Sequence, residues 1–208
     1  MSYSSLWVMD KNFNGSESVE FRNSWWFSPI IWDVLLEKYM HNEIQTPYGY
    51  KKTFMTEPNI LNDLNKIIND CNSITDRICW ELTMQQVFHT KDKEYVIKAI
   101  ESFLVDNVEY GVDETDDFSV LKAEHIMGRF EEIANQISNL DGEEYPYFIF
   151  KNTSVDDNVE RLFETYEEEL DEYINCPLSD VDGVELEFVE ISDGKIKFVD
   201  NVTYTTDR

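Results

Sequence analysis

Carboxylate side chains crowd the segment between residues 154 and 174, which holds nine acids and a single base, Arg161. Ser154 can cap a helix there, and apolar residues recur at intervals of three and four, so the pattern predicts a helix over 154–174. Such a helix would be roughly 31 Å long with one net negative charge about every 4 Å, close to the roughly 3.4 Å between phosphates along one DNA strand. The segment therefore has the linear charge density of a nucleic acid.

Two interpretations of these carboxylates are open. Acids four residues apart, such as Glu160 and Glu164, repel each other on a helix, and a solvated helix usually intersperses lysines among its acids. The pattern therefore favours a binding role, in which the anionic surface enters a cationic groove. The alternative is the solvated face of an acidic, highly soluble protein.

Negative charge also gathers elsewhere in the second half of the chain. Residues 105–208 hold 29 acids and 7 bases, whereas residues 1–104 hold 14 acids and 10 bases. If the acidic groups share a face, they would attract a basic groove and accelerate association at low salt. We therefore assign partner binding to the following acids: Asp113, Glu114, Asp116, Asp117, Asp156, Asp157, Glu160, Glu164, Glu167, Glu168, Asp171 and Glu172.

A second candidate contact is the adjacent pair Trp25 and Trp26. Neighbouring side chains cannot easily face the same way on a strand or helix, so at least one ring is expected at the surface, where tryptophan is a favoured interface anchor. We include both as candidate partner-binding residues. The alternative is that both fill a core between the first strands and the helices.

Other kinds of chemistry find little support. The sequence has no nucleophile elbow, glycine-rich phosphate loop or HExxH motif, so we assign no catalytic residue and no cofactor. The stretch 180–185 faintly resembles a calcium loop, but Leu178 occupies the position of the first ligand, so we assign no metal site. His125 falls on the apolar side of its predicted helix, which is typical of a hydrogen-bonded core histidine.

Composition and charge bound the class of protein. A chain of 208 residues that is 42% apolar and 14% aromatic can build a core, so we expect one domain over 1–208, with an aromatic-rich part at 1–110 and a strongly acidic part at 111–208. The formal net charge of -26 opposes direct binding to nucleic acid or to an anionic membrane. The sequence begins without a secretory signal pattern, so we expect a cytoplasmic location, the host cytoplasm if a phage encodes the protein. The three cysteines form no CxxC pair and are expected to remain thiols.

These residues must be positioned by elements that periodicity and caps predict. Alternation predicts strands at 4–9 and 17–22 in a hairpin, a strand at 145–150, and a C-terminal hairpin of 184–191 with 195–200. Helical spacing and start signals predict helices at 28–40, 56–71, 73–88, 95–104, 118–140 and 154–174. The fold class is therefore α+β, with a central helical layer of about six helices and short antiparallel strands from the N-terminal and C-terminal segments. The outer strands are expected to share one sheet.

The function that these features favour is that of an acidic inhibitor, which blocks the basic nucleic-acid-binding surface of a partner enzyme. DNA-mimicking anti-restriction and anti-CRISPR proteins of phages act in this way, and the analogy rests on charge and size. An immunity protein that neutralises a nuclease toxin would use the same physics. A small metal-binding protein or enzyme built on carboxylates is the alternative from another class. The partner is expected to be a basic protein, and the oligomeric state is left open.

Overall fold

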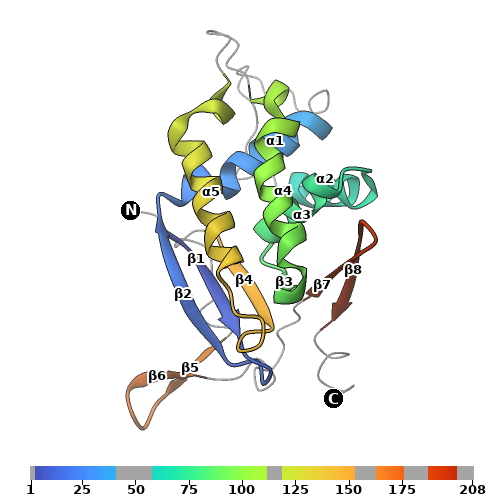
Figure 1. Cartoon of the computed structure of the whole chain (residues 1–208). Coiled ribbons are helices and arrows are strands. Elements are labelled where there is room, and N and C mark those ends of the chain that lie inside the picture. Colours follow the sequence, from blue (N-terminus) through green and yellow to red (C-terminus); the bar gives the residue numbers. More distant parts are fainter. Residues whose placement is uncertain (1–2, 41–57, 112–118, 153–162, 176–186, 201–208) are drawn as a thin grey trace.

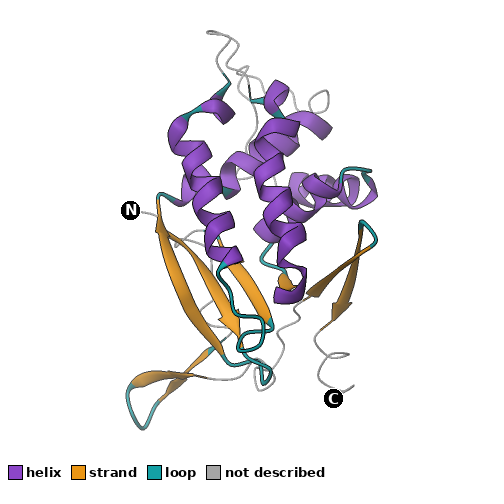
Figure 2. Cartoon of the chain, in the orientation of Figure 1, coloured by secondary structure: helices purple, strands orange, loops and turns teal. Residues whose placement is uncertain are grey.

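The computed structural model describes residues 3–40, 58–111, 119–152, 163–175 and 187–200. Its helices pack on one face of a six-stranded mixed sheet, with strand order β2-β1-β4-β3-β7-β8 (Figures 1 and 2). Neighbouring strands are antiparallel except β3 and β7, which are parallel. The strands are β1 (Tyr3–Met9), β2 (Gly15–Arg22), β3 (Val87–His89), β4 (Tyr147–Lys151), β7 (Glu187–Ser192) and β8 (Lys195–Asp200).

Five α-helices lie within the described residues, and together with the sheet they confirm the predicted α+β class. The prediction of about six helices is one too many for this part of the chain. They are α1 (Ser28–Met40), α2 (Pro58–Asp70), α3 (Ile74–Thr83), α4 (Lys93–Asp106) and α5 (Glu124–Ser138). Short 3-10 turns join them: η1 (Ser24–Trp26), η2 (Thr90–Asp92), η3 (Val108–Tyr110) and η4 (Val120–Lys122).

Both predicted terminal hairpins form, and they lie in the same sheet as expected. In the first, the Asp10 carboxylate accepts hydrogen bonds from the backbone N–H groups of Asn12 and Asn14, at 2.7 and 3.0 Å, which holds the turn. In the second, Asp193 and Gly194 have φ values of 49° and 71°, the left-handed pair that a tight two-residue hairpin turn requires. The first three residues of the predicted strand 184–191 lie outside the described part of the chain.

Local signals also place the starts of two helices. Helix α1 has the predicted bounds, although Ser28 is its first residue and Pro29 its second, one position later than the cap and proline pattern predicts. Helix α3 is preceded by Ser73, whose hydroxyl accepts the backbone N–H of Asp76 at 3.2 Å. These two ends were readable because each depends on residues that are adjacent in sequence.

The predicted helix 73–88 is too long, because α3 ends at Thr83. Gln85 adopts a left-handed φ of 57°, which stops the helix, and residues 87–89 then form β3 between β4 and β7. Val87 and Phe88 are fully buried in this strand. A β-branched and an aromatic residue in a short run suit a central strand as well as a helix, so tertiary pairing decides the structure here.

The largest correction concerns the predicted helix 154–174. Residues 153–162 lie outside the described part, and from Glu164 the chain forms an antiparallel hairpin of β5 (Glu164–Glu167) and β6 (Glu172–Asn175). Repulsion between acids four residues apart opposes a helix, whereas Tyr166 and Ile174 belong to residue types that favour strands. Asp171, with a φ of 55°, supplies the left-handed position of the turn.

Alternate side chains of the sheet build two cores. On the helix-covered face, Leu6 and Val8 join Phe88, Phe148 and the apolar sides of all five helices. On the opposite face a second cluster of buried residues consists of Trp7, Met9, Phe13, Val87, Tyr147, Ile149, Phe163 and Phe188. Phe163 is the residue directly before the β5–β6 hairpin, so this second core is what attaches the hairpin to the sheet.

Candidate functional site

The acids predicted to bind a partner fall into two groups. Seven lie outside the described residues: Asp113, Glu114, Asp116, Asp117, Asp156, Asp157 and Glu160. The other five lie on the β5–β6 hairpin: Glu164, Glu167, Glu168, Asp171 and Glu172. The structure therefore gathers these five on one hairpin, although the hairpin replaces the helix that was expected to carry them.

We call residues 166–172 the acidic tip. Glu167 and Glu172 face each other directly across the two strands, a position in which like charges destabilise a hairpin. Glu168, Glu169 and Asp171 are exposed in the connecting turn. None of the ion pairs found among the described residues involves the acidic tip. Its negative charge is therefore not neutralised by the part of the chain that the structure describes.

Two apolar side chains stand among these carboxylates. Tyr166 and Leu170 are 48% and 59% exposed, and the Tyr166 hydroxyl donates a hydrogen bond to the Asp171 carboxylate. The hydrogen bond fixes the tyrosine ring beside the turn. The acidic tip thus offers an aromatic and an aliphatic contact among its carboxylates, and tyrosine is a residue type enriched at interface hot spots.

The hairpin is attached at its base by Phe163. This residue is completely buried, and its ring stacks on Trp7 with centroids 5.6 Å apart and planes 15° from parallel. Figure 1 shows the hairpin projecting beyond the end of the six-stranded sheet. A firmly packed base and a projecting tip suit an element that enters a groove on another molecule.

The tryptophan pair is separate from the acidic tip. Trp25 is 50% exposed, as expected for at least one of the two rings, whereas Trp26 is half-buried and packs against His125 with ring centroids 4.8 Å apart. Both belong to η1, which comes shortly after the last residue of β2. The base of the β5–β6 hairpin lies at the other end of β2, beside its first residue, Gly15. Eight residues of strand separate these ends by about 25 Å. The structure therefore does not bring the tryptophans and the acidic tip into one site.

The expectation of a buried His125 is wrong, because the side chain is exposed. The predicted helix 118–140 is interrupted by η4, so that α5 starts only at Glu124 and His125 lies in its first turn. There Trp26, itself half-buried, covers one side of the imidazole. Helical spacing correctly identified Phe130, Ile133 and Ile137 as the buried face of α5, but it extended that face too far toward the N-terminus.

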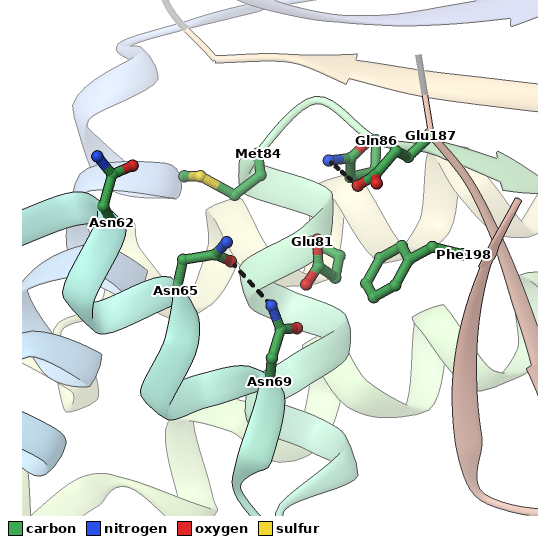
Figure 3. Close-up of a pocket in the computed structure, with 8 residues that line it drawn as sticks. All are labelled: Asn62, Asn65, Asn69, Glu81, Met84, Gln86, Glu187 and Phe198. Carbon is green, nitrogen blue, oxygen red and sulfur yellow. Dashed lines mark hydrogen bonds between the residues drawn. The ribbon is translucent and has the colours of Figure 1, made fainter. Parts of the chain in front are cut away.

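A polar pocket between α2, α3 and the β7–β8 hairpin was missed by sequence reasoning. Its volume is about 350 Å³, and eight residues line it (Figure 3): Asn62, Asn65, Asn69, Glu81, Met84, Gln86, Glu187 and Phe198. The spacing of the three asparagines places them on one face of α2, a signal that could have been read. Their opposite wall comes from residues more than a hundred positions later, which no local pattern reveals.

Glu81 is the most unusual residue of this pocket. Its side chain is buried, with the residue only 2% exposed, and its Oε1 atom has no hydrogen-bond partner within the described part of the chain. Burial raises the pKa of this carboxyl to about 8, and the negative charge of Glu187 contributes to the increase. The positive charge of Arg77 lowers the pKa by a smaller amount. Glu81 therefore holds its proton at a pH at which ordinary glutamates are ionised.

The remaining candidate chemistry can be placed briefly. Within the described residues no group of three or more His, Cys, Asp or Glu side chains is arranged to share a metal ion, and the stretch 180–185 lies outside them. Cys71 and Cys79 are free thiols, and burial raises the pKa of Cys79 well above its usual value. No helix in the described part of the chain has both the length and the apolar character needed to cross a bilayer.

Comparison with known proteins adds no family. Neither the protein-family models, nor the curated proteins, nor the solved structures contain a match to this chain.

Proposed function

We propose that the protein is an acidic binding protein that blocks the basic nucleic-acid-binding surface of a partner enzyme. The observation that carries the proposal is the acidic tip, where Glu167 directly opposes Glu172. Like charges placed across a hairpin reduce its stability, so the stability of the isolated protein does not explain this arrangement. A cationic groove that receives the tip would turn the same repulsion into attraction.

The charge of the whole chain supports the same role. A formal net charge of -26 produces a negative field that steers basic surfaces toward the protein and repels nucleic acid. Steering of this kind raises association rates at low salt and weakens as salt screens the charges. Tyr166 and Leu170 would then supply the contacts that remain after the charges are screened.

The partner class follows from the chemistry of the tip. Enzymes that act on nucleic acids carry grooves lined with Lys and Arg that bind phosphates, and closely spaced carboxylates compete for such a groove. A phage protein that counters a restriction or CRISPR enzyme and an immunity protein that neutralises a nuclease toxin both fit this chemistry. Both would be inhibitors, and both would be displaced by duplex DNA.

The test begins with capture of nucleic-acid-binding enzymes on the immobilised protein, from a heparin-enriched fraction of the native host. We expect a captured enzyme whose binding is lost when salt is raised several-fold and is competed by duplex DNA. The enzyme's own DNA binding should fall when the protein is added. Capture that is insensitive to salt and DNA would contradict the proposal and would favour the exposed Trp25 as the contact.

A matched pair of variants separates the hairpin from the general charge. The first variant carries Glu167→Lys, Glu168→Lys and Asp171→Lys and should lose most of its inhibition. The second carries three reversals at exposed acids on α4 and α5, and so has the same net charge: Glu94→Lys, Glu101→Lys and Glu131→Lys. It should inhibit nearly as well as the unaltered protein at moderate salt. Equal losses in the two variants would remove the acidic tip from the interface.

A further inference from the structure

The polar pocket contains two hydrogen-bond acceptors that the residues described by the structure leave unsatisfied. Oε1 of Glu81 and Oδ1 of Asn69 are both buried and have no partner among the described residues. Unsatisfied buried acceptors are costly, and each unusual case calls for a physical reason. Because Glu81 and Asn69 both line the same pocket, a single molecule with several N–H groups that enters it would satisfy both acceptors together.

The orientation of the asparagine amides is set by neighbouring residues. Asn65 Oδ1 accepts a hydrogen bond from the indole N–H of Trp80 at 2.8 Å and another from Asn69 Nδ2 at 3.3 Å. The Asn69 amide is thereby fixed with its nitrogen toward Asn65, as the dashed line in Figure 3 marks, so its oxygen is the atom left unpaired. The pocket presents this acceptor in advance of any ligand.

The charge of the pocket selects a cation. Two carboxyl groups, Glu81 and Glu187, line it, and none of the eight described residues that line it is Lys, Arg or His. The charged groups that act on Glu81 are Glu187 from β7, which opposes its ionisation, and Arg77 from α3, which favours it to a smaller extent. A cation bound beside Glu81 would favour its ionised form, so that the Glu81 carboxylate accepts hydrogen bonds in the complex.

The walls favour an organic cation over a metal ion. Calcium needs six to eight oxygen ligands within about 2.6 Å, whereas the described residues contain no cluster of three carboxylate, histidine or cysteine ligands. The pocket volume of about 350 Å³ lies near the lower end of small-molecule sites, which range from about 300 to 1,000 Å³. Met84 and Phe198 add apolar surface, and an aromatic ring attracts guanidinium and ammonium groups.

We propose that this pocket binds an organic cation rich in N–H groups, of the guanidinium or alkylammonium class, through Glu81, Asn69 and Glu187. Glu81 and Asn69 accept hydrogen bonds at the back of the pocket. Glu187, which is exposed and accepts a hydrogen bond from Gln86 Nε2 at 3.4 Å, binds the cation at the entrance. The cation is either a free small molecule or the end of an arginine or lysine side chain on another protein. The site is independent of the acidic tip and is tested without it.

The test is titration of the whole protein with butylguanidinium. Binding is measured by calorimetry and by the NMR signals of the side-chain amides of Asn65, Asn69 and Gln86. We expect saturable binding that shifts these amide signals. Tetramethylammonium, which has the charge but no N–H group, should bind at least about tenfold more weakly. Absence of saturable binding, equal binding of tetramethylammonium, or binding of Ca²⁺ in preference to butylguanidinium would each overturn the proposal.

Variants test the residues. Glu81→Gln keeps the shape of the side chain and should weaken butylguanidinium binding by about tenfold or more, since it removes a charge-assisted hydrogen bond. Glu94→Gln makes the same chemical change at an exposed position of α4 and should leave the affinity unchanged. Unchanged affinity in the Glu81 variant would refute the assignment.

A second ligand pair distinguishes the source of the cation. N-acetyl-arginine amide carries the same guanidinium with a peptide backbone attached. Tighter binding of this compound than of butylguanidinium indicates an arginine side chain of a protein partner, and weaker binding indicates a free small cation. Binding of neither compound overturns the proposal in both forms.

Discussion

A β-carbon added to Gly15 would overlap the ring of Phe163, well inside van der Waals contact. Gly15 is the first residue of β2, and Phe163 is the residue that attaches the β5–β6 hairpin to the second core. The absence of a side chain at one position therefore makes room for the aromatic ring that holds the acidic tip in place.

Gly15→Ala should accordingly destabilise the protein by about 1–3 kcal/mol, the usual cost of forcing extra atoms into a packed core. The matched control is Gly128→Ala in α5, where an added β-carbon meets nothing within 4 Å. That change should stabilise the protein by roughly 0.5–1 kcal/mol, because alanine is the better helix former. Urea denaturation measures both, and a neutral Gly15 variant would mean that Phe163 does not pack as described.

Reversal of one acid in the hairpin should stabilise it. Glu172→Lys places a cation opposite Glu167 and should strengthen the cross-strand pair by about 0.2–1 kcal/mol. Glu168→Lys, in the turn, makes the same change in charge without a cross-strand partner and should have a smaller effect. Hydrogen exchange of the β5 and β6 amides reports the difference. Faster exchange in the Glu172 variant would show that the opposed carboxylates do not strain the hairpin.

The buried carboxyl of Glu81 predicts a specific pH dependence of stability. Its pKa is about 8 in the folded protein and near the ordinary 4.5 in the unfolded chain, so the folded state retains a proton that the unfolded state releases between these values. The free energy of unfolding contributed by this group is fully present below pH 4.5 and is lost as pH rises through about 8. The loss is on the order of 3–5 kcal/mol.

The comparison of Glu81→Gln with the unaltered protein isolates this effect. The variant should lack the decline in stability that ionisation of Glu81 causes. Its unfolding free energy should therefore increase relative to that of the unaltered protein as pH rises from about 5 to about 9. Glu94→Gln should follow the unaltered protein throughout. Parallel curves for the Glu81 variant and the unaltered protein would show that the carboxyl is ionised in the fold.

Among the acids that form ion pairs in the described part of the chain, Asp76 should be the one whose removal lowers the free energy of unfolding most. It is fully buried and accepts hydrogen bonds from Lys38 Nζ at 2.7 Å, Tyr39 Oη at 2.7 Å and Asn107 Nδ2 at 3.0 Å. Asp76→Ala removes the ion-pair partner of the Lys38 ammonium together with an acceptor of Tyr39 and Asn107, and should destabilise the protein by about 3–5 kcal/mol.

The control for this prediction is the exposed pair of Asp63 and Lys66, which lie 3.1 Å apart on α2. Asp63→Ala should change the free energy of unfolding by no more than about 1 kcal/mol, because water already screens that pair. Thermal or urea denaturation of the two variants gives the comparison. Similar effects at both positions would mean that burial of Asp76 does not strengthen its contacts.

Sequence reasoning succeeded where structure depends on neighbours in the chain. The two terminal hairpins and the starts of α1 and α3 follow from turn residues, alternation and caps such as Ser73. For the segment 163–175 the same reasoning predicted a helix and was wrong, because the spacing of its apolar residues is compatible with a helix and with strands. What decides between them is the burial of Phe163 against Trp7, which lies more than 150 residues earlier in the chain.

The candidate sites were predictable to different degrees. The identity of the acids on the hairpin could be read from composition, although their arrangement across two strands could not. Glu81 resembles any other glutamate in the sequence, because its burial arises only when α2 and the β7–β8 hairpin close over it. Its raised pKa is a property of the assembled fold, as is the opposition of Glu167 and Glu172.

The parallel pairing of β3 with β7 has a consequence for how the protein is made. Val87 pairs with Phe188, so the middle of the sheet cannot be completed until the ribosome has synthesised about a hundred further residues. A nascent chain that ends before Glu187 holds β3 with one backbone edge uncovered, open to pairing with other chains. Acquisition of the native sheet is therefore a late event in translation, and conditions that stall elongation between these two strands would favour aggregation over folding.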